Sequence, residues 1–178
     1  NGIKGRLLGK LKNVNYETKN ATKYKANTTN ELFGALGYLT EVDFYKKGNS
    51  GADHLLTPKM LLRYAPGHMR EETSKTRLNH LNIFNLDRLN AYDNFENGLS
   101  TTLGFNYKVK NLVNEFNFSL GQVINERENK NMPSTSSLDQ RFSDVVGYSN
   151  FEVNKKIKLN YNFALDQNLK SLNYNEVG

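Results

Sequence analysis

The sequence predicts an all-β protein in which about eight antiparallel strands form a segment of a larger up-and-down transmembrane β-barrel. Three observations lead to this prediction. Apolar and polar residues alternate with a period of two along most of the chain, and no stretch keeps a long helical period. Several of these runs reach the roughly 9–11 residues that cross a bilayer with tilt. Long polar connections alternate with tight turns, as in outer-membrane meanders.

The composition excludes a helical membrane protein. Of the 178 residues, 37% are hydrophobic, and the chain has no Cys and no Trp. The mean hydropathy is -0.70, and no run approaches the roughly 20 apolar residues of a membrane helix. A barrel stays compatible with these values because its lumen-facing residues are polar. The net charge of +6 suits anionic partners such as phosphorylated lipid or nucleic acid, although we expect most of the Lys residues to be solvated on loops.

The alternation places each expected strand. The strands are predicted at 2–16, 31–45, 54–65, 98–109, 112–125, 143–153, 157–167 and 170–177. Long polar loops are expected near 66–97 and 126–142, with tight turns near 110–111 and 154–156. Residues 1–178 are interpreted as one partial outer-membrane barrel domain. Because Asn1 follows neither a Met nor a signal peptide and Gly178 ends in a strand-like run, we expect an internal fragment.

Apolar parity changes from odd to even numbers between the strands at 98–109 and 112–125. Facing residues of an antiparallel hairpin share a face, so a two-residue turn at Lys110-Asn111 would pair Phe105 with Phe116 and Val109 with Leu112. The lipid-facing side would then comprise Leu99, Leu103, Phe105, Tyr107, Phe116, Phe118 and Leu120. The reverse side would face the lumen with small polar residues, among them Thr102, Asn117 and Ser119.

The hairpin of 143–153 and 157–167 keeps odd parity, which requires an odd number of turn residues. Asn154-Lys155-Lys156 supplies three. This register pairs Phe151 with Leu159, Gly147 with Phe163, and Glu152 with Lys158. An aromatic ring over a glycine and an opposite-charge pair both stabilise sheets. The lipid-facing residues expected on its second strand are Leu159, Tyr161 and Phe163.

The earlier strands are less regular. Pro58 cannot donate to a ladder, so it marks a strand start, an edge or a bulge. Both faces of 31–45 are apolar from Leu32 to Leu39, which leaves its register open. Strand 2–12 carries cations on one face, which is either a contact surface for phosphate groups or, as we favour, a hydrated lumen wall. These cations are Lys4, Arg6, Lys10 and Lys12.

The sequence contains no pattern that predicts catalysis, a cofactor or a metal site. Its three His residues, His54, His68 and His80, have no close ligand spacing with another His or a Cys. A membrane hydrolase would need Ser, His and a polar group that orients the His, but no spacing supports Ser119, His80 and Asn117 in these roles. The glycines are scattered singly and form no phosphate-binding loop. We therefore predict that the protein is not an enzyme.

Several segments resemble, in order and spacing, the LPS-assembly protein family of the Gram-negative outer membrane, also called the LptD or organic solvent tolerance family. They are "LLTPKMLLRYAPG" (55–67), "IFNLDRLNAYDNFENGLSTTLGFNY" (83–107), "EFNFSLGQV" (115–123) and the chain from "RFSDVV" onward. The resemblance covers 50–178 well and 1–49 more loosely. The residues that match the family pattern are Thr57, Pro58, Lys59, Arg63, Leu86, Asp87, Arg88, Gly121 and Gln122.

The resemblance implies a large closed barrel in the outer membrane that takes lipopolysaccharide (LPS) from a periplasmic LPS-transport bridge and releases it to the outer leaflet. It also implies the LPS-assembly lipoprotein LptE as a partner in the lumen, outer-membrane lipid outside, and neither a cofactor nor nucleic acid. The family's periplasmic jellyroll, cysteines and lateral gate would lie outside this chain.

Two further expectations concern the loop at 66–97, and two alternatives stay open. The loop should reach the outside or fold over the lumen, and Asp87-Arg88 should form a structural ion pair. The alternatives are a general porin or receptor barrel and a soluble β-sandwich binding module, whose strands also have one apolar face.

Overall fold

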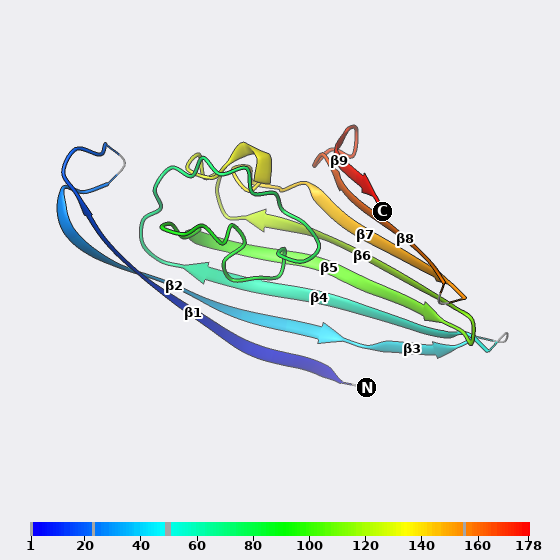
Figure 1. Ribbon diagram of the computed structural model, residues 1–178. Coiled ribbons are helices and arrows are strands. Elements are labelled where there is room, and N and C mark those ends of the chain that lie inside the picture. Colours follow the sequence, from blue (N-terminus) through cyan, green and yellow to red (C-terminus); the bar gives the residue numbers. More distant parts are fainter. Residues whose placement is uncertain (1, 23, 49–50, 155) are drawn as a thin grey trace.

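The computed structural model describes residues 2–22, 24–48, 51–154 and 156–178, and these form a single antiparallel sheet (Figure 1). The strand order is β1-β2-β4-β5-β6-β7-β8-β9, and β3 pairs with β4 beyond the end of β2. The strands are β1 (Ile3–Thr18), β2 (Asn27–Val42), β3 (Phe44–Lys47), β4 (Asp53–Ala65), β5 (Gly98–Lys110), β6 (Asn114–Asn125), β7 (Val145–Val153), β8 (Ile157–Leu165) and β9 (Leu172–Val177). The all-β antiparallel prediction is confirmed.

The expected strand at 31–45 is divided into β2 and β3, which makes nine described strands. Pairing of β2 with β4 runs as far as Glu41 opposite Lys59, and β3 resumes it at Phe44 opposite Leu56. Pro58 of β4 therefore lies beside the interruption, where its missing N–H costs no ladder bond. Asp43 fills the gap by accepting a 2.7 Å hydrogen bond from the Thr57 hydroxyl.

The first hairpin extends past the rest of the sheet. β1 and β2 pair from Ile3–Val42 to Thr18–Asn27, whereas β2 and β4 stop pairing at Leu36–Tyr64. Figure 1 shows the free part of this hairpin curving away at one end of the sheet. The long connections 66–97 and 126–144 and the shorter 166–171 leave the sheet at this same end, and the tight turns lie at the other.

The register predicted for the β5–β6 hairpin is wrong. Phe105 faces Leu120 rather than Phe116, and the last pair before the turn is Lys110–Glu115. The cause is the Asn111 side chain, whose Oδ1 accepts the backbone N–H groups of Val113 at 2.9 Å and Asn114 at 2.6 Å. This Asx-type bonding builds a longer turn, so Val109 does not pair with Leu112. The predicted and observed registers differ by an even number of residues, so the apolar residues still change from odd numbers on β5 to even numbers on β6.

The register predicted for the β7–β8 hairpin is confirmed. Phe151 faces Leu159, Gly147 faces Phe163, and Glu152 faces Lys158. A Cβ on Gly147 would lie 2.2 Å from the Phe163 ring, so the ring covers the glycine closely. Asn154 takes a positive φ of 52°, and the Lys156 N–H closes the turn on the Val153 carbonyl at 3.0 Å. Lys155 of this turn lies outside the described residues.

The buried core lies on one face of the sheet only. Segment 66–97, here called the inner segment, folds across this face and packs against β1, β2 and β4 through Leu86 and Phe95. Connection 126–144 covers the neighbouring part through Met132 and Leu138; it contains a short 3-10 helix, Ser134–Ser136. No helix among the described residues is long and apolar enough to cross a membrane.

Candidate functional site: the two faces of the sheet

One face of the sheet, here called the apolar face, carries large hydrophobic side chains that no described residue covers. Leu7 on β1 is 78% exposed, Leu36 on β2 61%, and Leu62 on β4 47%. The pairing registers place these residues on one face with the odd positions of β5, β7 and β8 and the even positions of β6. A contiguous apolar surface of this kind marks an interaction site or a membrane contact.

The ten residues predicted to face lipid all lie on the apolar face. Their aromatic rings form a chain across the strands, with centroids 5.9 Å apart for Phe105–Phe118, 6.4 Å for Phe118–Phe163 and 5.6 Å for Tyr161–Phe163. The rings of β6 and β8 meet across β7 because β7 presents only Gly147 and Ser149 between them. The other six are Leu99, Leu103, Tyr107, Phe116, Leu120 and Leu159.

The opposite face, here called the covered face, is shaped to receive the inner segment. Three of its glycines lie directly beneath apolar side chains of that segment. A Cβ on Gly37 would lie 2.6 Å from Leu86, one on Gly104 3.0 Å from Phe84, and one on Gly121 2.9 Å from Ile83. These glycines therefore let "IFNL" approach the sheet backbone closely.

A buried carboxylate, that of Glu96, joins the inner segment to β4. Arg63 of β4 and Arg88 are each 1% exposed, and Glu96 is 2% exposed. Arg88 donates to both Glu96 carboxylate oxygens, while the guanidinium of Arg63 lies 3.5 Å from one of them. Arg63 also donates to the carbonyls of Leu86 at 2.7 Å and Glu96 at 2.5 Å. Pairing and hydrogen bonding together make these buried charges tolerable.

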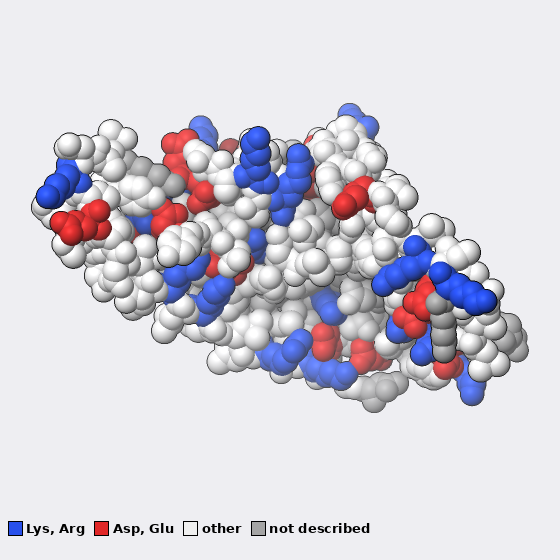
Figure 2. Space-filling view, viewed as in Figure 1, with Lys and Arg blue, Asp and Glu red and all other residues white. Residues whose placement is uncertain are grey.

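The cations of β1 are paired with carboxylates on the same face. The Asp87 carboxylate forms ion pairs with the ammonium groups of Lys10 at 3.1 Å and Lys12 at 2.7 Å, and its side chain is fully buried. Figure 2 shows acidic and basic side chains side by side along the edge formed by β1 and β2, where Lys4 meets Asp43 at 2.5 Å and Arg6 meets Glu41 at 3.7 Å. The expectation of an Asp87–Arg88 ion pair is wrong, because Arg88 turns to Glu96 instead.

Arg70 fastens the inner segment to the extended β1–β2 hairpin, and sequence reasoning did not single it out. Its guanidinium pairs with Glu31 of β2 and lies over three rings, 5.5 Å from the centroid of Tyr16, 5.2 Å from Tyr24 and 5.7 Å from Phe33. Cation–π contacts of this kind strengthen with desolvation. The sequence gives no local sign of this contact, since 39 residues separate Arg70 from Glu31.

The remaining predicted residues divide between the two faces. Thr102 is completely buried beneath the inner segment, where its hydroxyl donates to the Ile83 carbonyl at 3.4 Å. Asn117 belongs to an amide row with Asn150 and Asn160. Gln122, on the apolar side of β6, fixes the end of the connection that leads into β7, because its side chain donates to the Ser143 carbonyl at 2.9 Å. The covered face also carries Thr57, Lys59 and Ser119.

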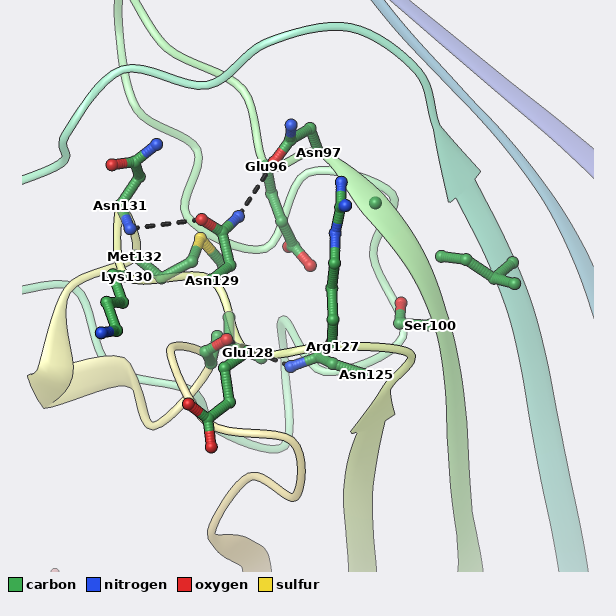
Figure 3. Close-up of a pocket in the computed structure, with 13 residues that line it drawn as sticks. Glu96, Asn97, Ser100, Asn125, Arg127, Glu128, Asn129, Lys130, Asn131 and Met132 are labelled. Atoms are coloured by element: carbon green, nitrogen blue, oxygen red, sulfur yellow. Dashed lines mark hydrogen bonds between the residues drawn. The ribbon is translucent and has the colours of Figure 1, made fainter.

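A cavity of about 340 Å³ opens between the inner segment and connection 126–144 (Figure 3). Amide side chains hold its two walls together, since Asn129 donates to the Asn97 side chain at 2.9 Å and its oxygen accepts the Asn131 N–H at 3.2 Å. The Arg127 side chain points into the cavity beside Glu96. These bonds tie the two long connections into one structure.

A second cavity, of about 430 Å³, lies on the covered face between β4–β7 and the tip of the inner segment. Two asparagines shape that tip: Asn79 accepts the N–H groups of Leu81 and Asn82, and the Asn82 side chain donates to the Arg77 and Arg88 carbonyls. The tip places His80 flat on the Tyr148 ring, with centroids 4.2 Å apart. Burial lowers the pKa of His80 below its ordinary value.

This second cavity brings together Ser119, His80 and Asn117, which the sequence alone gave no spacing to connect. Ser119 lies directly opposite Tyr148 in the β6–β7 ladder, so the histidine stacked on that ring is beside it. Among the described residues, no three His, Asp or Glu side chains are grouped so that they could hold a metal ion.

A family model described as "LptD: LPS transport system D" matches residues 10–178. No curated protein and no solved structure matches the chain.

Proposed function

Because the chain belongs to the LptD family of LPS transport proteins of the Gram-negative outer membrane, we propose that it forms part of the wall of an outer-membrane barrel through which LPS passes. Its nine strands would be a portion of that barrel. The long connections at 66–97 and 126–144 would lie at the external end, and the tight turns at the periplasmic end.

One observation carries this proposal: the sheet buries its polar face and leaves its apolar face open. Arg63, Thr102 and Ser100 are at most 3% exposed, whereas Leu7, Leu11 and Ile3 are at least 75% exposed. A protein dissolved in water would turn these groups the other way. In a bilayer the apolar face contacts hydrocarbon, and the strands satisfy their backbone hydrogen bonds within the sheet.

The open edges of the sheet fit the same interpretation. β1 is an edge strand of 16 residues, and β9 is one of 6. Unpaired strand edges do not occur in hydrocarbon, since each orphan backbone group costs several kcal/mol there. We therefore place further barrel strands of the full-length protein beside β1 and β9. These further strands would close the wall.

In this account the polar and apolar parts of LPS follow different surfaces. The saccharide would pass along the covered face, where ion pairs, amides and hydroxyls replace water. The acyl chains would end in the outer leaflet. The inner segment narrows the passage, because it lies across the sheet and is fixed by Glu96 and Arg70. The work would come from the periplasmic LPS-transport bridge, and the wall itself would be non-catalytic.

The lumen would also hold the lipoprotein LptE. Its contacts would fall on parts of the covered face that the inner segment leaves free, such as the exposed position Lys158 on β8. Outer-membrane lipid would surround the apolar face.

Depletion of the full-length protein in its host distinguishes this function from that of a general porin. We expect newly made LPS to accumulate before the outer leaflet, while the uptake of small sugars through the outer membrane stays unchanged. Normal arrival of LPS together with reduced sugar uptake would favour the porin.

A soluble β-sandwich makes a different prediction for the purified protein. A sandwich would cover the apolar face with a second sheet and would stay monomeric in buffer without detergent. We expect the protein to require detergent or lipid to remain monomeric.

A further inference from the structure

We propose that the cavity under His80, here called the inner cavity, is a binding subsite for an anionic saccharide unit. This inference rests on the proposed function and assigns one step of the passage to a defined place. The inner cavity is lined by Lys59, His80, Lys108, Asn117, Ser119 and Tyr148, among others. Its volume of about 430 Å³ falls within the range of about 300–1,000 Å³ that small-molecule sites occupy.

Two polar atoms of the lining lack a partner in the part of the chain that the structure describes. They are the Ser119 hydroxyl and Nδ1 of His80, and both are buried. Unpaired buried polar groups are costly, about 1–3 kcal/mol each. Both residues line the cavity, and a rotation of either side chain would present these atoms to ligand hydroxyls, so a group rich in hydroxyls would satisfy both.

The amides of the lining extend this polar surface. Asn117 already donates to Glu115 at 3.0 Å and to Asn150 at 3.4 Å, which fixes the orientation of its side chain. Asn106 of β5 is exposed on the same side. Fixed amides and hydroxyls around a concave site are suited to hydrogen bonding with sugar hydroxyls.

The charges around the cavity favour a negative ligand. Lys59 lies 3.8 Å from Glu41, which Arg6 also approaches. Lys108 lies 2.8 Å from Glu115, which Lys110 approaches at 3.9 Å. Glu41 itself belongs to the lining, and Asp43 beside it pairs with Lys4. A net positive charge still remains beside the cavity, because the five cations Lys4, Arg6, Lys59, Lys108 and Lys110 face the three carboxylates Glu41, Asp43 and Glu115. Lysine binds phosphate and carboxylate groups as a point charge.

The experiment uses the full-length protein in its host membrane, with a photoreactive benzophenone side chain introduced at position 106 in the inner cavity. Matched positions are 158, which is exposed on the covered face of β8, and 159, which is exposed on the apolar face beside the tight turn, away from the outer leaflet. After illumination, adducts are detected with antibody against the LPS saccharide. We expect an adduct at position 106 and at most a trace at position 159.

Two charge variants test the subsite itself. In Lys59→Gln/Lys108→Gln we expect the adduct at position 106 to fall at least fivefold. In the matched pair Lys156→Gln/Lys158→Gln, which removes the same charge away from the cavity, it should change less than twofold. Equal losses in both variants would overturn the subsite, because the lysines would then act only through overall charge.

Competition separates the class of ligand without altering the cavity lysines. Anionic core oligosaccharide freed of its lipid should suppress the adduct at position 106 in the purified protein, and neutral maltohexaose at the same concentration should not. Equal competition by both sugars would overturn the anionic preference. Adducts at position 158 without one at 106 would reject this inference alone, whereas the absence of adducts at both positions would reject the proposed passage as well.

Discussion

Glu96 holds two buried guanidinium groups, so its charge matters more than that of any exposed acid in the described chain. Glu96→Gln would leave Arg63 and Arg88 without their shared carboxylate in a site that is 1–2% exposed. We expect a loss of about 3–5 kcal/mol in the free energy of unfolding, because unpaired buried charges are costly. Urea unfolding of the protein in detergent micelles measures it.

The control for this substitution is Glu128→Gln, which changes the same group at an exposed position. It should alter the free energy of unfolding by less than about 0.5 kcal/mol. Similar values for the two variants would show that Glu96 contributes no more than a solvated acid.

His80 gives the inner segment a dependence on pH. Burial lowers its pKa below 6.5, so near that pH the folded protein binds fewer protons at this site than the unfolded chain. The contribution to stability is therefore complete above about pH 6.5 and declines as the pH falls through the lowered pKa. We expect amide protection of residues 76–82 to fall between about pH 7.5 and 5.5.

The matched variant for this prediction is His80→Phe, which keeps a ring against Tyr148 but does not titrate. Hydrogen exchange, corrected for the intrinsic rate at each pH, should show little change in its protection factors over the same range. An equal pH dependence in His80→Phe would assign the effect to another group.

For single residues, the sequence indicated which positions matter but not which side chains contact each other. The family resemblance pointed to Arg63 and Arg88, yet neither periodicity nor spacing indicated that Glu96 joins them. Arg63 and Glu96 are 33 residues apart, and Arg70 and Glu31 are 39 apart. Contacts of this kind depend on how the inner segment crosses the sheet, and no local pattern encodes that path.

Among the elements, the contact between the inner segment and the sheet depends on glycine. Gly37→Ala would place a Cβ 2.6 Å from Leu86 of the inner segment and 3.1 Å from Leu61 of β4. Since both of these side chains are buried in the core, neither can move aside cheaply, and we expect a loss of about 1–3 kcal/mol in the free energy of unfolding, the range for overpacking. Proteolysis of residues 66–97 should also become faster.

Gly9→Ala is the control for this prediction, because it lies in a strand but would meet its nearest neighbour, Leu36, only at 3.7 Å. Its effect should stay within about 0.5 kcal/mol. Equal sensitivity at the two positions would mean that strand propensity, rather than the seat for the inner segment, decides the cost.

The two tight hairpins show what alternation can predict about an element. It gave the β7–β8 register correctly because the three-residue turn left one solution, with Gly147 under Phe163. It gave the faces of β5 and β6 but not their register, because the Asn111 side chain builds a longer turn. Parity fixes which face a residue takes, whereas turn chemistry fixes its neighbour.

The strand at 31–45 was ambiguous for a physical reason. Phe33, Ala35 and Leu39 are buried against the inner segment and against Leu61, while Leu32, Leu36 and Tyr38 form part of the apolar face. A strand with apolar contacts on both sides loses the alternation from which register is predicted. The only sequence feature that indicated the interruption of this strand at Asp43 was Pro58, which lies on the neighbouring strand.

For the whole molecule, we predict that the two faces of the sheet differ in their tolerance of charge. Phe105→Lys or Phe163→Lys should prevent assembly into the outer membrane, because a Lys in the middle of a lipid face costs about 2–4 kcal/mol. Asn117→Lys, on the covered face, should be tolerated. The yield of folded protein in outer-membrane fractions measures this, and equal yields of all three variants would contradict the assignment of faces.

The placement of the apolar face in hydrocarbon can be measured through the accessibility of a nitroxide label moved along β6 from residue 116 to 120 in lipid vesicles. We expect the accessibility to alternate with a period of two: collisions with dissolved oxygen dominate at Phe116, Phe118 and Leu120, whose side chains share the apolar face. Collisions with a water-soluble nickel complex should dominate at Asn117 and Ser119. A flat profile, or one with the two quenchers exchanged, would contradict this placement.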